Sequence, residues 1–157
     1  MTHLALRRIS FGGTSAIVSG MGLILGLNAA EGSRRIIVGA LLIFALADNL
    51  ADSLSVHAYQ EAELLAQKDA FATTVANFAA RLLITMSFIG LVVFSPTAML
   101  AFLAGAWGLA LLIALTVLLA RARGAAIIGE VSKHLLVAGL VIVASHWIGT
   151  LINVHTR

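Results

Sequence analysis

Residues that could do chemistry are concentrated in one polar segment, 48–63, which directly follows an apolar run. Asp48 and Asp52 are four residues apart, so on a helix their carboxylates lie one turn apart on the same face. Two such carboxylates form a partial site for a hard divalent cation, which takes oxygen ligands. His57, one turn beyond Ser53 on a neighbouring stripe, could add a nitrogen ligand for a transition metal.

Arg81 offers a different explanation for one of these carboxylates. It is the one charged residue of the apolar stretch 70–94, and it lies at a similar depth when counted back from the turn at Pro96. An Asp52–Arg81 ion pair and a ligand role for Asp52 are therefore equal alternatives. Asp48 has no obvious basic partner in the sequence, which favours a functional role. For His57, near the end of its span, a solvated or hydrogen-bonded ring is the simpler interpretation.

Other reactive chemistry is not indicated. The sequence contains no cysteine, no Gly-x-Ser-x-Gly elbow and no phosphate-cradling glycine loop. His134 and His146 are twelve residues apart, more than three helical turns, and cannot share one small site within a chain. We therefore expect neither an enzyme nor a bound cofactor.

The composition places these residues in a membrane protein. Of the 157 residues, 61% are hydrophobic and 11% are charged, whereas a soluble domain has about 45–50% and about 25%. This balance excludes a disordered chain and an ordinary cytosolic enzyme. The ten Lys and Arg residues lie between apolar runs, which is typical of membrane topology and gives no reason to expect a nucleic-acid partner.

Five apolar runs are long enough to cross a bilayer as helices. They predict one all-α transmembrane domain, 1–157, with helices over about 9–30, 35–67, 70–94, 97–120 and 125–153. Asp48 then lies about 18 Å along the second helix, just past the bilayer midplane. A carboxylate at that depth costs roughly 2.5–3.5 kcal/mol, so it should face protein, water or a cation.

The basic residues of the loops predict the orientation. One side of the membrane carries six, and the opposite side carries three: Arg7, Arg8, Lys68, Arg121, Arg123 and Lys133 against Arg34, Arg35 and Arg157. We therefore expect a multi-pass protein of the cell (inner) membrane with a cytoplasmic N-terminus and an outside C-terminus.

Small residues of the first helix repeat at three- and four-residue spacing: Ser15, Ser19, Gly22 and Gly26. Such spacing lets two helix backbones approach closely in lipid. It serves internal packing, the favoured use, or a seam between two chains. We expect a two-fold homodimer with this helix at or near the seam.

Three stretches carry a resemblance to a known family. They are residues 15–27, then Leu54-Ser55-Val56 with Tyr59, and finally Gly139 with Ile148-Gly149. With the five-span plan, they resemble the first, second and closing helices of the vacuolar iron transporter family. The resemblance implies a homodimer that carries ferrous iron or manganese across the lipid bilayer.

The family's metal ligands carry over in part. Asp48 matches its acidic residue on the second helix, Val56 stands at its methionine, and Ser15 stands at its first-helix aspartate. The family's acidic cytoplasmic segment is nearly absent. The resemblance thus implies a metal site that keeps Asp48 and includes Ser15, with three further candidates to rebuild it: Ser19, Asp52 and His57.

These observations predict an integral membrane transporter of divalent metal ions, iron or manganese first, with an intramembrane acidic site on the second helix. The missing ligands favour the alternative of a non-transporting membrane scaffold or partner-binding subunit. A proton-coupled carrier of another small solute is a third, weaker interpretation.

Overall fold

The computed structural model describes residues 2–62 and 67–155, with side chains for residues 12–61 and 70–155. Within these ranges the regular structure is entirely helical. The elements are α1 (Thr2–Ala29), α2 (Arg34–Ile43), the π-helix η1 (Phe44–Asp48), α3 (Asn49–Ala62), α4 (Gln67–Phe94), the 3-10 turn η2 (Thr97–Met99), α5 (Leu100–Arg123) and α6 (Ile127–His155).

Five of the helical stretches are long and apolar enough to cross a membrane, which confirms the predicted all-α, five-span architecture. They are Gly12–Ala29, Arg34–Glu61, Ala70–Phe94, Thr97–Arg123 and Ile127–His155. The second stretch joins α2, η1 and α3 into one continuous helix. The sequence predicted that this helix ends near residue 67, beyond Ala62, and residues 63–66 lie outside the described part of the chain.

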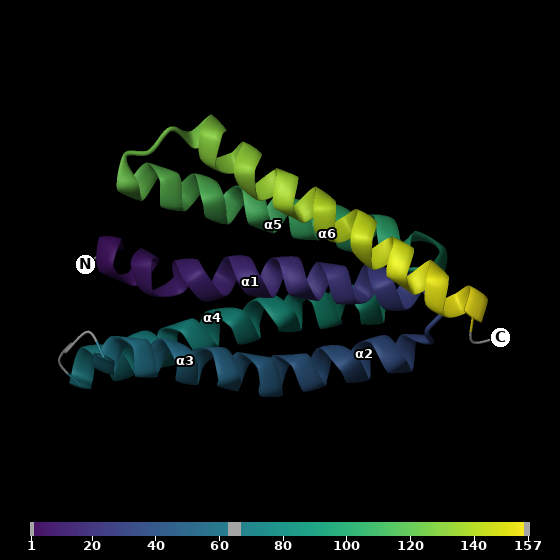
Figure 1. Cartoon of the computed structure of the whole chain (residues 1–157), viewed down its shortest axis with the longest axis horizontal. Coiled ribbons are helices and arrows are strands. Elements are labelled where there is room, and N and C mark those ends of the chain that lie inside the picture. The colour runs from purple at the N-terminus through teal and green to yellow at the C-terminus, as the bar shows by residue number, and fades with distance from the viewer. Residues whose placement is uncertain (1, 63–66, 156–157) are drawn as a thin grey trace.

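Helix α1 is the central helix of the bundle (Figure 1). The α5–α6 hairpin packs on one side of it, and α2, η1, α3 and α4 pack on the other. Buried side chains of α1, among them Ile17 and Met21, meet Phe88 of α4 and Leu112 of α5 in one apolar core. The two ends of the described chain lie at opposite ends of the bundle, as an odd number of spans requires.

Arg34 fixes the register between the second and third spans. Its guanidinium donates hydrogen bonds to the carbonyl oxygens of Val93 (2.8 Å) and Ser95 (2.6 Å) at the end of α4. Asp48 lies 14 residues after Arg34, and Arg81 lies 13 residues before Phe94, the last residue of α4. At 1.5 Å per residue, both side chains start about 20 Å from this end of the bundle.

The small residues of α1 pack against α6 within the same chain. A Cβ added at Gly22 would lie 2.8 Å from Val141 Cγ1, and one added at Gly149 would lie 2.1 Å from the carbonyl oxygen of Gly26. These contacts need glycine, because backbone approach replaces side-chain packing here. The internal use of the spacing is confirmed for Gly22 and Gly26. The homodimer, with this helix at or near its seam, stays a prediction.

Candidate functional site

Arg81 is the centre of a buried polar cluster between α1, the second span and α4. Its side chain is 1% exposed. Nε donates to Asn49 Oδ1 (2.8 Å), Nη1 donates to Asp52 Oδ2 (3.0 Å), and Nη2 donates to Asp48 Oδ2. Nη1 also lies 3.4 Å from the carbonyl oxygen of Gly12 on α1. One guanidinium therefore ties three spans together.

The π-helix explains how neighbouring residues of one helix reach the same guanidinium. Asp48 ends η1 and Asn49 begins α3, and both contact Arg81. In a regular α-helix, consecutive side chains point about 100° apart. A π-turn closes i→i+5 and holds more residues, which reduces that angle. Asp52, one turn further on, completes the same face.

Asn77 forms the second layer of contacts. Its Nδ2 donates to Asp52 Oδ2 (3.2 Å) and to Ser53 Oγ (3.5 Å). A Cβ at Gly12 would lie 1.9 Å from Asn77 Oδ1 and 2.9 Å from Arg81 Cδ, so only glycine fits there. We define the Arg81 cluster as Gly12, Asp48, Asn49, Asp52, Asn77 and Arg81.

The Arg81 cluster carries two carboxylates and one guanidinium, and so a net charge of −1 when both acids are ionised. The exposure of the two acids differs: 49% for the Asp48 side chain and 23% for that of Asp52. Arg81 and Asn77 donate only to the Oδ2 atoms, and no described residue donates a hydrogen bond to Oδ1 of either acid. Among the residues whose side chains are described, the two carboxylates thus share one guanidinium, and neither Oδ1 accepts a hydrogen bond from it.

The predicted Asp52–Arg81 ion pair is confirmed, whereas the expectation that Asp48 has no basic partner is wrong. Asp48 binds the same arginine as Asp52. Asp48 reaches the guanidinium for two reasons. The contact of Arg34 with the end of α4 puts Asp48 and Arg81 at the same depth, and the wide π-turn directs the Asp48 side chain toward Arg81. The four-residue spacing of Asp48 and Asp52 already indicated a shared partner, because residues on one face of a helix contact the same neighbouring helix. That either acid binds a metal ion stays a prediction.

His57 takes the hydrogen-bonded role rather than joining the Arg81 cluster. Its Nδ1 is 3.2 Å from the Thr74 hydroxyl, and its Nε2 is 3.3 Å from Glu61 Oε1. In the part of the chain that the structure describes, His57 does not form a group of three or more His, Asp or Glu side chains that could hold a metal ion. A ligand role for His57 would need a rearrangement of these contacts.

The two predicted serines lie on α1 at different levels. Ser15 is half-buried one turn after Gly12, and Ser19 is exposed one turn further on. Ser19 lines an apolar groove that also contains Phe44 of η1. The structure therefore places Ser19 beside that groove, and its role as a metal ligand stays a prediction.

A polar stripe on α4 was missed by the sequence analysis. Its members recur every four residues and are all buried: Thr73, Asn77, Arg81 and Thr85. Polar residues at that interval in an apolar run form one face, and in lipid such a face must be covered by polar partners. The spacing was therefore a usable signal for Asn77, although none existed for Gly12.

Together, the five apolar helices and the ion pair inside their bundle define a membrane protein with a charged centre. No family model, curated protein or solved structure matches this chain.

Proposed function

We propose that the chain is a membrane carrier of cations and that the Arg81 cluster is its cation site. The observation that carries this proposal is Asp48: a carboxylate deep in a span, 49% exposed, with an Oδ1 that no described residue binds. A charge at such a depth is costly and normally marks a substrate or ion pathway. A cation that enters beside Asp48 would cancel the remaining negative charge of the cluster.

The proposed cargo is a divalent metal ion, iron or manganese first. The carboxylate oxygens of Asp48 and Asp52 are its ligands in this proposal, with Ser15, Ser19 and His57 as further candidates. Arg81 lowers the cost of placing two acids in the bilayer by neutralising one of them. It also limits the site, because the cargo must bind through oxygens that the guanidinium leaves free.

The second candidate function is a non-transporting scaffold or partner-binding subunit. The observation that favours it is the complete engagement of Arg81, whose Nε, Nη1 and Nη2 all have partners. Hydrogen bonds from one guanidinium to two other spans hold these helices in one arrangement. In this alternative the Arg81 cluster serves only to lock three spans together.

For its setting, we propose the cell inner membrane, with the N-terminus in the cytoplasm, the C-terminus outside and two chains per assembly. The positive-inside rule supports the orientation. The end of the bundle that holds the start of α1 also holds the end of α3, the start of α4 and the α5–α6 connection (Figure 1). Four of the basic residues lie in or beside those connections: Lys68, Arg121, Arg123 and Lys133.

The test is uptake of Fe²⁺, Mn²⁺, Co²⁺ and Zn²⁺ into proteoliposomes that contain the full chain. We expect uptake of at least one metal by the wild type and loss of that uptake in Asp48→Asn. The matched control is Glu130→Gln, a carboxylate paired with Lys133 and Arg123 far along the chain from the cluster. No uptake of any metal by correctly folded wild-type protein would leave the scaffold as the better account.

A further inference from the structure

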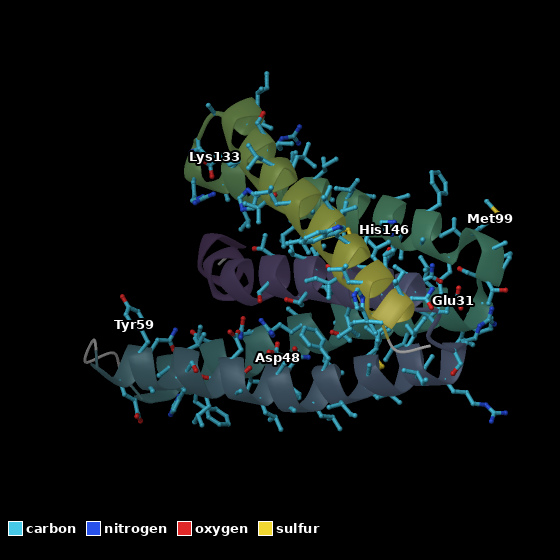
Figure 2. The ribbon with its side chains drawn as sticks, turned by 45° about the vertical axis from the view of Figure 1, so that its right-hand side comes forward. Glu31, Asp48, Tyr59, Met99, Lys133 and His146 are labelled. Carbon is cyan, nitrogen blue, oxygen red and sulfur yellow. The ribbon has the colours of Figure 1, made fainter. Side chains whose placement is uncertain are left out.

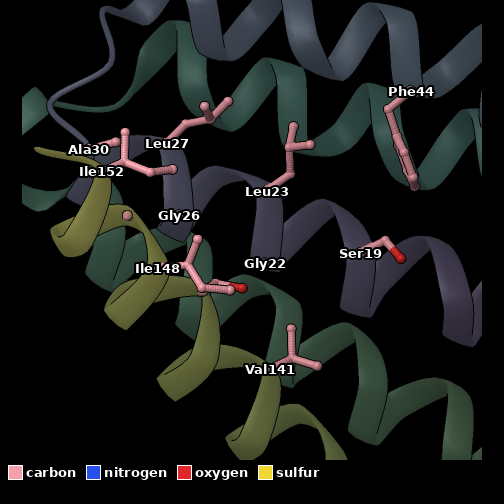
Figure 3. A pocket seen from close by; sticks show the side chains of 12 residues that line it. Ser19, Gly22, Leu23, Gly26, Leu27, Ala30, Phe44, Val141, Ile148 and Ile152 are labelled. Carbon is pink, nitrogen blue, oxygen red and sulfur yellow. The ribbon is translucent and has the colours of Figure 1, made fainter. Parts of the chain in front are cut away.

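An apolar groove of about 380 Å³ runs along α1 between α6 and the second span (Figure 3). Gly22 and Gly26 form its floor on α1, Ser145 and Ile148 come from α6, and Phe44 comes from η1. Sites for small molecules are typically about 300–1,000 Å³ and mostly apolar, with few polar groups. The groove has the size and the lining of such a site.

One end of the groove approaches the Arg81 cluster. Ser19 and Phe44 lie at this end, and the Phe44 ring points toward α1 (Figure 3). The second span runs antiparallel to α1, so residues that come later in one helix lie beside residues that come earlier in the other. Asp48, one turn after Phe44, therefore lies at the level of Ser15, one turn before Ser19. Figure 2 shows Asp48 at the edge of the second span that is turned toward α1. The contacts of Arg81 agree with this placement, because its guanidinium contacts both Asp48 and the carbonyl oxygen of Gly12 on α1.

The chemistry of this end is that of a cation-binding site with an apolar body beside it. Phe44 lines the groove with an aromatic ring, and Asp48, one turn further along the second span and outside the lining itself, adds a half-exposed carboxylate that is paired with Arg81. An aromatic face and a carboxylate both attract an organic cation. The aliphatic walls would cover the apolar substituents of that cation.

We propose that this groove binds lipophilic organic monocations, with the positive charge beside Asp48 and the apolar body between Phe44, α1 and α6. The positive charge of the ligand complements two carboxylates, Asp48 and Asp52, that share the Arg81 guanidinium. A neutral lipid chain or a second copy of the chain would use the apolar walls alone and would make no use of the half-exposed Asp48 carboxylate. This site concerns another class of ligand, so it holds whether or not the protein carries a metal ion.

The test is equilibrium binding of radiolabelled tetraphenylphosphonium to the purified full chain in detergent. Tetraphenylborate, which has the same shape and the opposite charge, is the matched ligand. We expect the wild type to bind the cation and to exclude the anion. Asp48→Asn should raise the Kd for the cation at least about tenfold, because it removes the Coulomb attraction between the carboxylate and the monocation, which near a protein surface is worth more than one decade.

A second variant, Ser19→Leu, fills the end of the groove without touching Arg81 and should weaken binding to a similar degree. Glu130→Gln and Ser132→Leu, at exposed or paired positions away from the groove, should bind as the wild type does. Folding of each variant is checked by its elution volume and melting temperature.

Four results would overturn the proposal. Absence of cation binding by the wild type, or equal binding of tetraphenylborate, would mean that the groove selects no positive charge. If Ser19→Leu binds the cation fully and Asp48→Asn does not, the ligand lies outside the groove. If Asp48→Asn binds the cation fully and Ser19→Leu does not, the groove binds the ligand through its apolar walls alone. Metal uptake by the same wild-type preparation separates a failure here from a failure of the carrier proposal.

Discussion

At the scale of residues, Arg81 determines how two acids can exist inside a bilayer. A lone carboxylate in a span is costly, and a lone guanidinium is costly as well. In the Arg81 cluster each acid shares the same base, and Asn49, Asn77 and Gly12 satisfy further donors and acceptors. Breaking such a set by removing one member leaves an uncompensated buried charge, whereas removing both members of a pair is milder.

This reasoning predicts the stability of variants of the Arg81 cluster. Arg81→Ala should lower the unfolding free energy by about 3–5 kcal/mol, and adding Asp52→Asn should recover part of that loss. Coupling with Asp48→Asn should also be present but smaller, because Asp48 is 49% exposed and Asp52 is 23% exposed. Double-mutant cycles from denaturant titrations in mixed micelles measure both values. Zero coupling between Arg81 and Asp52 would mean that their contact contributes nothing to stability.

The candidate site was predictable from sequence only as far as helix periodicity reaches. The four-residue spacing of Asp48 and Asp52, and the depth of Arg81, offered the Asp52 ion pair as one of two equal alternatives. Hydropathy carries no information on the π-turn, because a wider turn changes the direction of side chains and leaves composition unchanged. The close approach of Gly12 to Asn77 depends on how two distant helices cross, and a single sequence does not contain that angle.

At the scale of elements, the glycines of α1 allow it to take the central position in the bundle. Its glycines let α6 approach from one side and α4 from the other. The five span lengths followed directly from the apolar runs, since a helix needs about 20 apolar residues to cross the hydrocarbon. The end of α5 lies three residues beyond the predicted end at 120, at Arg123, where Gly124 takes a positive φ of 67° at the C-cap, a conformation that glycine adopts without strain.

The α1–α6 contact predicts a specific sensitivity. Gly149→Ala should destabilise the chain, because the new Cβ would lie 2.1 Å from the Gly26 carbonyl oxygen, and a backbone atom can yield only if the helices separate. Overpacking of this kind typically costs about 1–3 kcal/mol. Gly139→Ala, on the same helix with nothing within 4 Å of the added Cβ, is the control and should be neutral or slightly stabilising. Equal melting temperatures for the two variants would contradict this packing.

At the scale of the whole molecule, the odd number of spans puts the two ends of the described chain at opposite ends of the bundle. Combined with the six basic residues of one side against three of the other, this predicts where reporters become active. A phosphatase fused after Arg157 should be active outside, and a fluorescent protein inserted in the α3–α4 connection should fluoresce in the cytoplasm. A cytoplasmic C-terminus would show that the orientation is reversed or that one helix does not span.

The central claim is that the free carboxylate oxygen and excess charge at Asp48 bind a cation inside the bundle. The most direct measurement is a calorimetric titration of Mn²⁺ into the purified full chain, with Asp48→Asn and Glu130→Gln as the two matched carboxylate variants. The account predicts saturable binding by the wild type and by Glu130→Gln, and none by Asp48→Asn. Binding that survives in Asp48→Asn, or a wild type that binds no Mn²⁺, would contradict it.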